Sequence, residues 1–225
     1  MTNPIATLTG GLIVSCQAYP GEPLRHPETT AQMAEAVVAG GAVAIRAQGL
    51  ADVSFIKGRT TVPLIGLWKD GHDGVFITPT LRHARAVRDA GAEIIALDGT
   101  RRPRPDGLTL ADTIARLRDS GPTLIMADCG SLDDALAASD AGADLIGTTL
   151  AGYTDDRPPT TGPDLELLAQ MVAHLPGLPI VAEGRVHTPE QARAALNTGA
   201  HAVVVGTAIT HPTTITNWFR QALAN

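Results

Sequence analysis

The amino-acid sequence predicts an α/β fold built as one (β/α)8 barrel of parallel strands, also called a TIM barrel. Three observations predict this fold: one short phrase recurs four times, eight apolar runs have the length of buried strands, and helical segments follow most of them. Eight evenly spaced βα units fit within the 225 residues. An open doubly wound sheet is the structural alternative, but no GxGxxG motif follows the first strand.

The predicted strands are of two kinds. Four begin with a small residue, Gly and Ala, in which the glycine closes the preceding helix in a left-handed conformation. These lie within residues 40–46, 90–98, 141–147 and 198–206. The other four are near-continuous apolar runs at residues 12–16, 63–68, 123–127 and 179–183. Runs without polar alternation are typical of parallel strands that are covered on both faces.

Eight helices are expected along the chain. They lie at residues 28–39, 51–58, 80–90, 109–119, 131–141, 164–174, 188–198 and 212–223. Ser131 and Thr188 have side chains suited to N-caps, and Thr78 before Pro79 gives a similar start signal. Because no long linker or low-complexity segment divides the chain, residues 1–225 are expected to form one catalytic domain.

The composition limits the class of protein. A net charge of −6 argues against a nucleic-acid binder, whose contact surface is basic. No apolar stretch is long enough to span a membrane, and the N-terminus lacks the pattern of a signal peptide. The two cysteines, Cys16 and Cys129, form no metal or redox motif, so we expect free thiols in a cytoplasmic protein. Only Lys57 and Lys69 among the 17 basic residues are lysines.

Polar residues stand at the ends of six predicted strands. They are Gln17, Arg46, Lys69, Asp98, Asp128 and Glu183. Active sites of (β/α)8 barrels are built at the C-terminal ends of the strands. Polar groups there are costly unless they face a wet pocket or pair with one another. We therefore expect this ring to surround the site, although any one residue can simply mark where a strand stops.

Glycines end the last two predicted strands, at Gly184-Arg185 and Gly206-Thr207. In this fold the loops after strands seven and eight commonly bind phosphate with backbone N–H groups and the N-terminus of a short helix. Glycine lets the backbone approach an anion closely, and Arg185 adds charge. The pattern indicates a small phosphorylated ligand, with ordinary turn glycines as the alternative.

Lys69 and Glu183 suggest acid–base chemistry. A lysine confined in a pocket loses part of its proton affinity and can act as a base. A Schiff base at Lys69 and a plain Lys–Glu ion pair are the alternatives. The histidines show no metal-binding spacing, so a reaction without metal or other cofactor is expected. His83, His174 and His201 are expected at the surface or as caps.

The chain resembles the bacterial N-acetylmannosamine-6-phosphate 2-epimerase family over nearly its whole length. The matching segments are residues 13–18, 20–24, 40–47, 65–69, 76–80, 95–98, 102–107, 126–128, 147–154, 182–185 and 200–210. The first segment and the Arg-Pro-Arg-Pro-Asp-Gly segment at 102–107 are specific, whereas the Gly-Ala strands occur in many phosphate-binding barrels.

The resemblance implies interconversion of N-acetylmannosamine 6-phosphate and N-acetylglucosamine 6-phosphate, in sialic acid or N-acetylmannosamine catabolism, by a homodimer without metal or nucleotide. It makes Lys69 the catalytic base and acid and Glu183 its acidic partner, with the transfer of a proton by Glu183 left open. The positions implied to hold the acetamido and hydroxyl groups are Gln17, Arg46 and Asp128. Those implied to hold the phosphate are Gly184, Arg185, Gly206 and Thr207.

The chain departs from the family pattern at His211, where an arginine before proline is typical, and at Thr207, where glycine is common. His211 is expected to hold the phosphate less strongly than arginine. Two other readings remain open: another cofactor-free barrel enzyme, thiazole-synthase-like or ribulose-phosphate-epimerase-like, and a non-catalytic sensor of an amino-sugar phosphate. The C-terminal segment with Trp218 and Phe219 is a candidate dimer contact or a part of the barrel wall.

Overall fold

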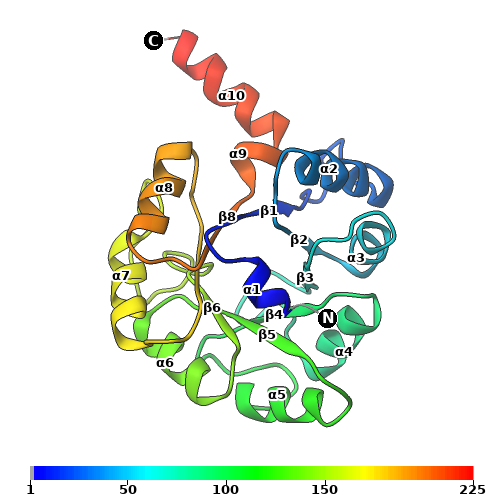
Figure 1. Cartoon of the computed structure of the whole chain (residues 1–225), viewed down its shortest axis with the longest axis vertical. Coiled ribbons are helices and arrows are strands. Elements are labelled where there is room, and N and C mark those ends of the chain that lie inside the picture. Colours follow the sequence, from blue (N-terminus) through cyan, green and yellow to red (C-terminus); the bar gives the residue numbers. More distant parts are fainter. Residues whose placement is uncertain (1–2, 225) are drawn as a thin grey trace.

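The protein is a closed barrel of eight parallel strands that follow one another around the ring in sequence order (Figure 1). The computed structural model describes residues 3–224. The strands are β1 (Leu12–Cys16), β2 (Ala44–Gln48), β3 (Leu64–Leu67), β4 (Ile94–Asp98), β5 (Leu124–Asp128), β6 (Leu145–Gly147), β7 (Ile180–Glu183) and β8 (Ala202–Val205). The predicted (β/α)8 barrel is therefore confirmed, and the open sheet is excluded because β1 pairs with both β2 and β8.

Helices surround the barrel as an outer ring. They are α2 (Pro27–Ala39), α3 (Leu50–Lys57), α4 (Leu81–Asp89), α5 (Leu110–Arg118), α6 (Leu132–Asp140), α7 (Leu165–His174), α8 (Pro189–Asn197) and α10 (Pro212–Leu223). All eight predicted helices are present, with ends that differ by at most one residue. Two short helices were not predicted, α1 (Pro4–Thr7) and α9 (Thr207–Thr210).

The core has two layers. The inner layer fills the barrel with side chains such as Ile13, Ile65 and Met126, and the outer layer joins the strands to the helices. Leu8, which follows α1, is fully buried and packs with the inner layer. Figure 1 shows α1 lying across one end of the barrel, so this short helix closes the end opposite to the strand C-termini.

Helix α4 begins differently from the sequence expectation. Its N-cap is Thr80, whose side chain accepts from the His83 N–H, whereas Thr78 lies two residues earlier with a φ of 47°. Ser131 and Thr188 cap α6 and α8 as predicted. His83 is buried rather than at the surface, with its ring between Thr80 and Asp70.

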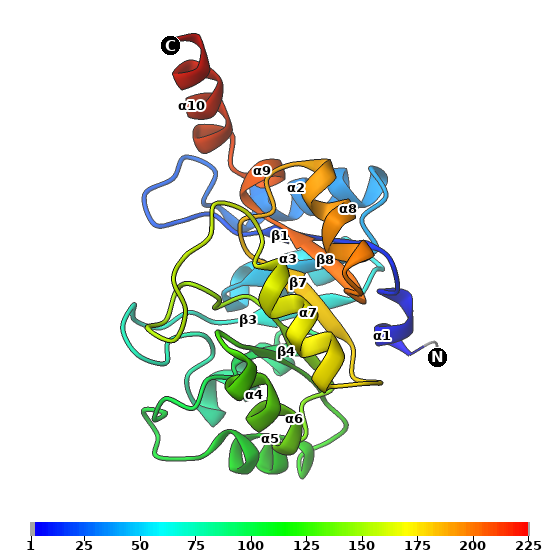
Figure 2. The same cartoon turned by 90° about the vertical axis from the view of Figure 1, so that its left-hand side faces the viewer.

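The last helix leaves the barrel. Figure 2 shows α10 pointing away from the body of the molecule, and none of its residues is buried. In a (β/α)8 barrel the eighth helix normally packs outside the eighth and first strands. Within residues 3–224, no helix is long and apolar enough to cross a membrane. Cys16 and Cys129 are both free and buried.

Candidate active site

A buried charged triad lies at the C-terminal ends of three strands. Arg46, from β2, donates to both carboxylate oxygens of Asp128, from β5, at 3.2 and 2.6 Å. The Nε of Arg46 lies 3.2 Å from Glu183 Oε1, on β7. Both Arg46 and Asp128 are almost completely excluded from solvent. One guanidinium therefore holds two carboxylates in fixed positions across the barrel.

Thr149 joins the same triad, and sequence reasoning missed it as a site residue. Its hydroxyl lies 2.8 Å from Asp128 Oδ1 and 2.9 Å from Glu183 Oε2, and it can donate its one proton to only one of them. Thr148 fixes the backbone at the end of β7, because its hydroxyl accepts from the Glu183 N–H and donates to the Glu183 carbonyl. The only sequence signal was two threonines at the end of a predicted strand.

Lys69 lies just beyond β3 and faces a cavity of about 390 Å³. The same cavity is lined by Gln17 and Glu183, so the structure brings these predicted residues together. No ion pair joins Lys69 to Glu183 among residues 3–224, because Glu183 is bound to Arg46 and Thr149 instead. The Lys69 ammonium lies 5.9 Å from the centre of the Tyr19 ring. The plain ion-pair alternative for Lys69 and Glu183 is therefore wrong.

The pKa values of the two groups move toward each other. Burial lowers the pKa of the Lys69 ammonium below its ordinary value, and the positive charge of Arg46 lowers it further, while Glu183 and Asp128 oppose the change. Burial raises the pKa of the Glu183 carboxyl, against the opposing charge of Arg46. Shifts in these directions bring the proton affinities of the two groups closer together, which suits acid–base chemistry.

Gln17 extends the polar lining from β1. Its amide donates to the Ser15 hydroxyl at 2.8 Å, and both residues face the cavity. Three members of the predicted ring do not line this cavity: Arg46 and Asp128, which are buried in the triad with Glu183, and Asp98. The Asp98 carboxylate instead accepts from Thr100 at 2.6 Å and from Arg102 at 2.8 Å and so fixes the loop after β4.

The glycine pairs meet on one side of the cavity. Gly184, Arg185, Gly206 and Thr207 all line it. Gly206 stands at the N-cap position of α9, the short helix after β8, so the first N–H groups of α9 lack helical acceptors. Gly184 and Arg185 have φ values of 107° and 55°, and this left-handed turn is favoured by glycine at the first position.

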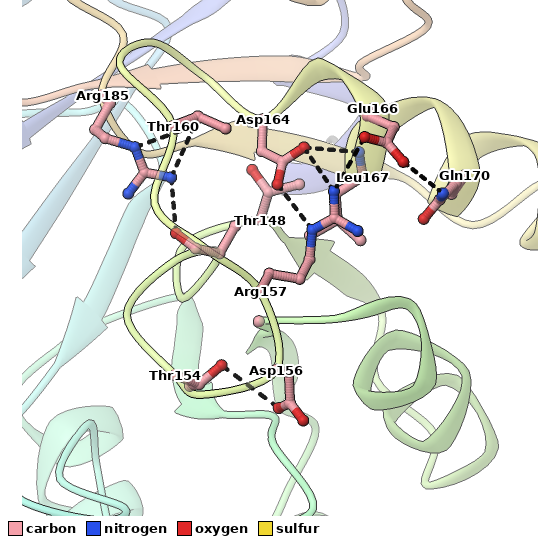
Figure 3. Close-up of polar contacts among 12 residues, drawn as sticks. Thr148, Thr154, Asp156, Arg157, Thr160, Asp164, Glu166, Leu167, Gln170 and Arg185 are labelled. Carbon is pink, nitrogen blue, oxygen red and sulfur yellow. Dashed lines mark hydrogen bonds and ion pairs between the residues drawn. The ribbon is translucent and has the colours of Figure 1, made fainter.

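The side chain of Arg185 is engaged elsewhere. Its guanidinium donates to the Ala151 carbonyl at 2.8 Å and to the Thr160 hydroxyl, and it lies over the Tyr153 ring. Figure 3 shows these contacts between Arg185 and the loop after β6. At the other end of this loop, Arg157 donates to the Asp164 carboxylate. The expectation that Arg185 adds charge to a phosphate is therefore not met by this conformation of its side chain.

His211 lines the cavity between α9 and α10 and is buried. Its Nδ1 lies 3.5 Å from Glu22 Oε1, and its ring packs against Tyr19 with a centroid distance of 4.8 Å. Both partners belong to the loop after β1, so His211 connects that loop to the glycine side of the cavity. Across residues 3–224, no three His, Cys, Asp or Glu side chains are grouped to hold a metal ion.

Comparison with known proteins agrees with the geometry. The profile of the family described as "Putative N-acetylmannosamine-6-phosphate epimerase" matches residues 30–225. A Cutibacterium acnes protein named "Putative N-acetylmannosamine-6-phosphate 2-epimerase" is 67% identical over 220 residues, covering 97% of this chain and 96% of its own. A protein of the same name from Caldanaerobacter subterraneus is 48% identical over 218 residues, covering 96% of this chain and 92% of its own.

Solved structures give the same result. The N-acetylmannosamine-6-phosphate 2-epimerase from Clostridium perfringens has a TM-score of 0.93 and 39% identity, covering 98% of this chain and 96% of its own. The thiamine phosphate pyrophosphorylase from Pyrococcus furiosus has a TM-score of 0.62 and 21% identity, covering 92% and 90%, and this likeness shows the fold alone.

The closed (β/α)8 barrel, with Lys69 and Glu183 lining one cavity, and the similar proteins define an enzyme of the carbohydrate epimerase class. Its family follows from the close relatives. The chain belongs to the N-acetylmannosamine-6-phosphate 2-epimerase family.

Proposed function

We propose that the protein interconverts N-acetylmannosamine 6-phosphate and N-acetylglucosamine 6-phosphate by removing a proton from C2 and returning one to the opposite face. The observation that carries the proposal is Lys69: it is partly buried, no ion pair joins it to a carboxylate among residues 3–224, and it lines the same cavity as Glu183. Family membership gives the substrate class.

We propose that the phosphate binds on the side of the cavity lined by Gly184 and Gly206, the glycine side. Backbone N–H groups of Gly184 and Arg185 and the start of α9 at Thr207 are suited to an anion there. His211 adds a ring with an N–H donor. The acetamido and hydroxyl groups then lie toward Gln17. Arg46, held by Asp128, keeps the Glu183 carboxylate in position.

The chemistry starts from the open-chain sugar, in which C2 is next to the C1 aldehyde. Neutral Lys69 takes the C2 proton, the C–H electrons form a C1–C2 double bond, and negative charge moves to the C1 oxygen. Strands β3 and β7 lie opposite each other in the ring of eight, so Lys69 and Glu183 address opposite faces of this planar enolate. Return of a proton to C2 from the second face restores the aldehyde and inverts the centre.

The test follows C2 by NMR in deuterated water, starting from N-acetylmannosamine 6-phosphate. We expect N-acetylglucosamine 6-phosphate with deuterium at C2, and no product from Lys69→Met. Lys57→Met is the matched control, because Lys57 pairs with Glu93 on the outer surface, and it should turn over normally. Binding without turnover by the wild type would instead support the sensor, and turnover by Lys69→Met would refute the assignment of the base.

A homodimer is proposed from the unpartnered last helix. Phe219 and Leu223, one helical turn apart on α10, are 70% and 88% exposed. The outer surface of β8 and β1, where an eighth helix normally packs, has an apolar groove lined by Leu12, Ala192, Leu196, Val203 and Val205. We propose that α10 of a second copy fills this groove, so that each chain supplies the missing helix of the other.

The cellular setting is proposed from the substrate. A phosphorylated amino sugar is a charged metabolite, and an enzyme that consumes it belongs in the cytoplasm. Breakdown of sialic acid or of N-acetylmannosamine is the pathway type that fits this reaction. No nucleic-acid partner is proposed, since the acidic chain offers no basic contact surface.

A further inference from the structure

Lys69 sits on a small hairpin rather than on its barrel strand. β3 ends at Leu67, and residues 68–78 turn back so that Lys69 bridges to Ile77 in an antiparallel pair. Trp68 and Thr78 close the hairpin: the Thr78 N–H donates to the Trp68 carbonyl at 2.8 Å, and the Trp68 N–H donates to the Thr78 hydroxyl oxygen at 3.1 Å. The backbone position of Lys69 therefore depends on this closure.

Thr78 is in a conformation that its residue type disfavours. Its φ of 47° lies in the left-handed region, which a β-branched side chain rarely adopts, and the residue is fully buried. Such strain persists only when the surrounding contacts hold it, and it concentrates at functional sites. The contacts that hold Thr78 are thus of interest for catalysis.

Arg104 holds the backbone of Thr78 through a hydrogen bond to its carbonyl. From the loop after β4, its guanidinium donates to the Thr78 carbonyl at 2.7 Å and to the Asp98 carbonyl at 2.9 Å. The Asp98 N–H in turn donates to the Ile77 carbonyl at 3.0 Å. Arg104 is only 6% exposed, and no ion pair joins it to a carboxylate within residues 3–224. Within residues 3–224 the Arg104 Nε has no hydrogen-bond partner, and a buried cation held by two carbonyls is costly, so its presence points to a role in fixing this backbone.

A second residue of the same motif reinforces the connection. Asp106 accepts from the Leu81 N–H at 2.9 Å, at the first turn of α4. The Arg-Pro-Arg-Pro-Asp-Gly motif at residues 102–107 therefore holds both the end of the hairpin and the start of the next helix. On the other side, buried His83 binds Asp70 and packs edge-on against Trp68. The hairpin that carries Lys69 is held from both sides.

We propose that Arg104, acting through the carbonyl of the strained Thr78, is a positioning residue that keeps the Lys69 ammonium at the buried wall of the cavity. This inference rests on the proposed function of Lys69 as the C2 base. The lysine side chain is long and flexible, so the position of its ammonium depends on the position of its backbone. A displacement of about 1 Å in such a group can cost about 100-fold in rate.

A loosened hairpin also changes the proton affinity of Lys69. The groups that shape it are Arg46 on β2, Asp128 on β5 and Glu183 on β7, with Tyr19 beside the ammonium. The other titratable groups lining the cavity are His72, Tyr153, Arg185, His187 and His211. Because burial is the main reason that the pKa of Lys69 is lowered, entry of water should raise this pKa toward its ordinary value.

The experiment compares Arg104→Met with Arg118→Met. Arg118 also donates to a backbone carbonyl, that of Gly142, but between α5 and β6, away from the hairpin. The rate of acetylation of each lysine by acetic anhydride is measured against pH by mass spectrometry, with Lys57 as internal reference, together with kcat and KM. We expect Arg104→Met to raise the Lys69 pKa and lower kcat about 10- to 100-fold with little change in KM. Arg118→Met should change neither.

Arg104→Lys should recover part of the loss, because one ammonium can still donate to a carbonyl. If Arg104→Met does not fold, Thr78→Val tests the same closure, since it keeps the side-chain shape and removes the acceptor of the Trp68 N–H. An unchanged Lys69 pKa with an unchanged kcat in the folded variant overturns the proposal. The labelling needs no turnover, so a shifted Lys69 pKa in a protein without epimerase activity would reject the proposed function and leave the positioning role intact.

Discussion

The burial that lowers the pKa of Lys69 also lowers the free energy of unfolding of the protein. In the unfolded chain the Lys69 ammonium is hydrated, whereas in the folded chain it is partly buried and, among residues 3–224, no ion pair joins it to a carboxylate. Its pKa is lowered mainly by this burial. Since the folded state disfavours the charged form, folding is weakened when the unfolded lysine is protonated. This penalty is fully present below the folded pKa and fades as pH rises toward the unfolded value of about 10.4.

Replacement of this lysine should therefore stabilise the fold. We expect Lys69→Met to raise the Tm at pH 7 by several degrees, with about 2–4 °C for each kcal/mol in a chain of this size. The gain over the wild type should shrink as pH rises from 8 to 10, because the wild type then loses its penalty. Differential scanning calorimetry of Lys69→Met and of Lys57→Met as control checks this. A Tm that falls in Lys69→Met at pH 7 contradicts the account.

Glu183 is predicted to serve the second face of the intermediate. Glu183→Gln keeps the shape and can still contact Arg46 and Thr149, but it cannot transfer a proton. We expect this variant to exchange the C2 proton of one epimer with solvent deuterium while epimer formation falls at least about 100-fold. NMR of each epimer incubated separately in deuterated water measures both rates.

The control for this variant is Glu93→Gln, whose carboxylate pairs with Lys57 on the outer surface and should behave as wild type. If Glu183→Gln loses exchange and epimerisation together on both epimers, Glu183 orients the sugar or Lys69 and transfers no proton. If epimerisation persists at the normal rate, Lys69 alone serves both faces.

At the residue scale, the sequence predicted the polar residues at the ends of strands. It did not predict the residues whose hydrogen bonds keep those polar residues in position. Lys69 and Glu183 were visible because a polar residue at the end of an apolar run is unusual. Thr149 was not visible, since its role depends on a hydroxyl placed between two carboxylates from β5 and β7. Thr78 was taken for a cap, because its left-handed φ has no signature in a Thr-Pro-Thr sequence.

At the scale of elements, long repeats were predictable and short helices were not. The eight long helices follow from caps and the Gly-Ala phrases, and their observed ends differ by at most one residue. Helices α1 and α9 have four residues each, too few for a periodic apolar pattern. Yet α9, which begins directly after Gly206, supplies the backbone N–H groups of the candidate anion site. Helix α1 closes the opposite end of the barrel.

Helix α10 shows a different limit of prediction. Its bounds were predicted correctly at Pro212–Leu223, but its direction away from the barrel was not. Trp218 still contacts the barrel through His187, at a centroid distance of 5.0 Å, whereas Phe219 faces outward. An amphipathic pattern states that a helix has an apolar face and does not state which surface covers it.

At the scale of the whole molecule, the closed barrel leaves one part of its outer wall uncovered. His187, at the edge of the groove beside β8 and β1, contacts Trp218 of α10, whereas Phe219 and Leu223 of the same helix stay exposed. Exposed apolar surface on both the groove and the helix is unfavourable in water, and pairing two copies buries both at once. The homodimer expected from the family resemblance thus has a physical reason in this structure.

Charge placed on the apolar face of α10 should separate the two copies. We expect the wild type to have about twice the 23.3 kDa mass of one chain and Phe219→Glu to have the mass of one chain, in light scattering after size-exclusion chromatography. Gln221→Glu, exposed on the side of α10 opposite to Phe219 and Leu223, is the control and should remain paired. Because the separated barrel lacks cover for β8 and β1, the Tm of the wild type should also fall with dilution, whereas the Tm of Phe219→Glu should not depend on concentration. A wild type that is monomeric at micromolar concentration, or a Phe219→Glu variant that stays dimeric, would show that α10 does not exchange between copies.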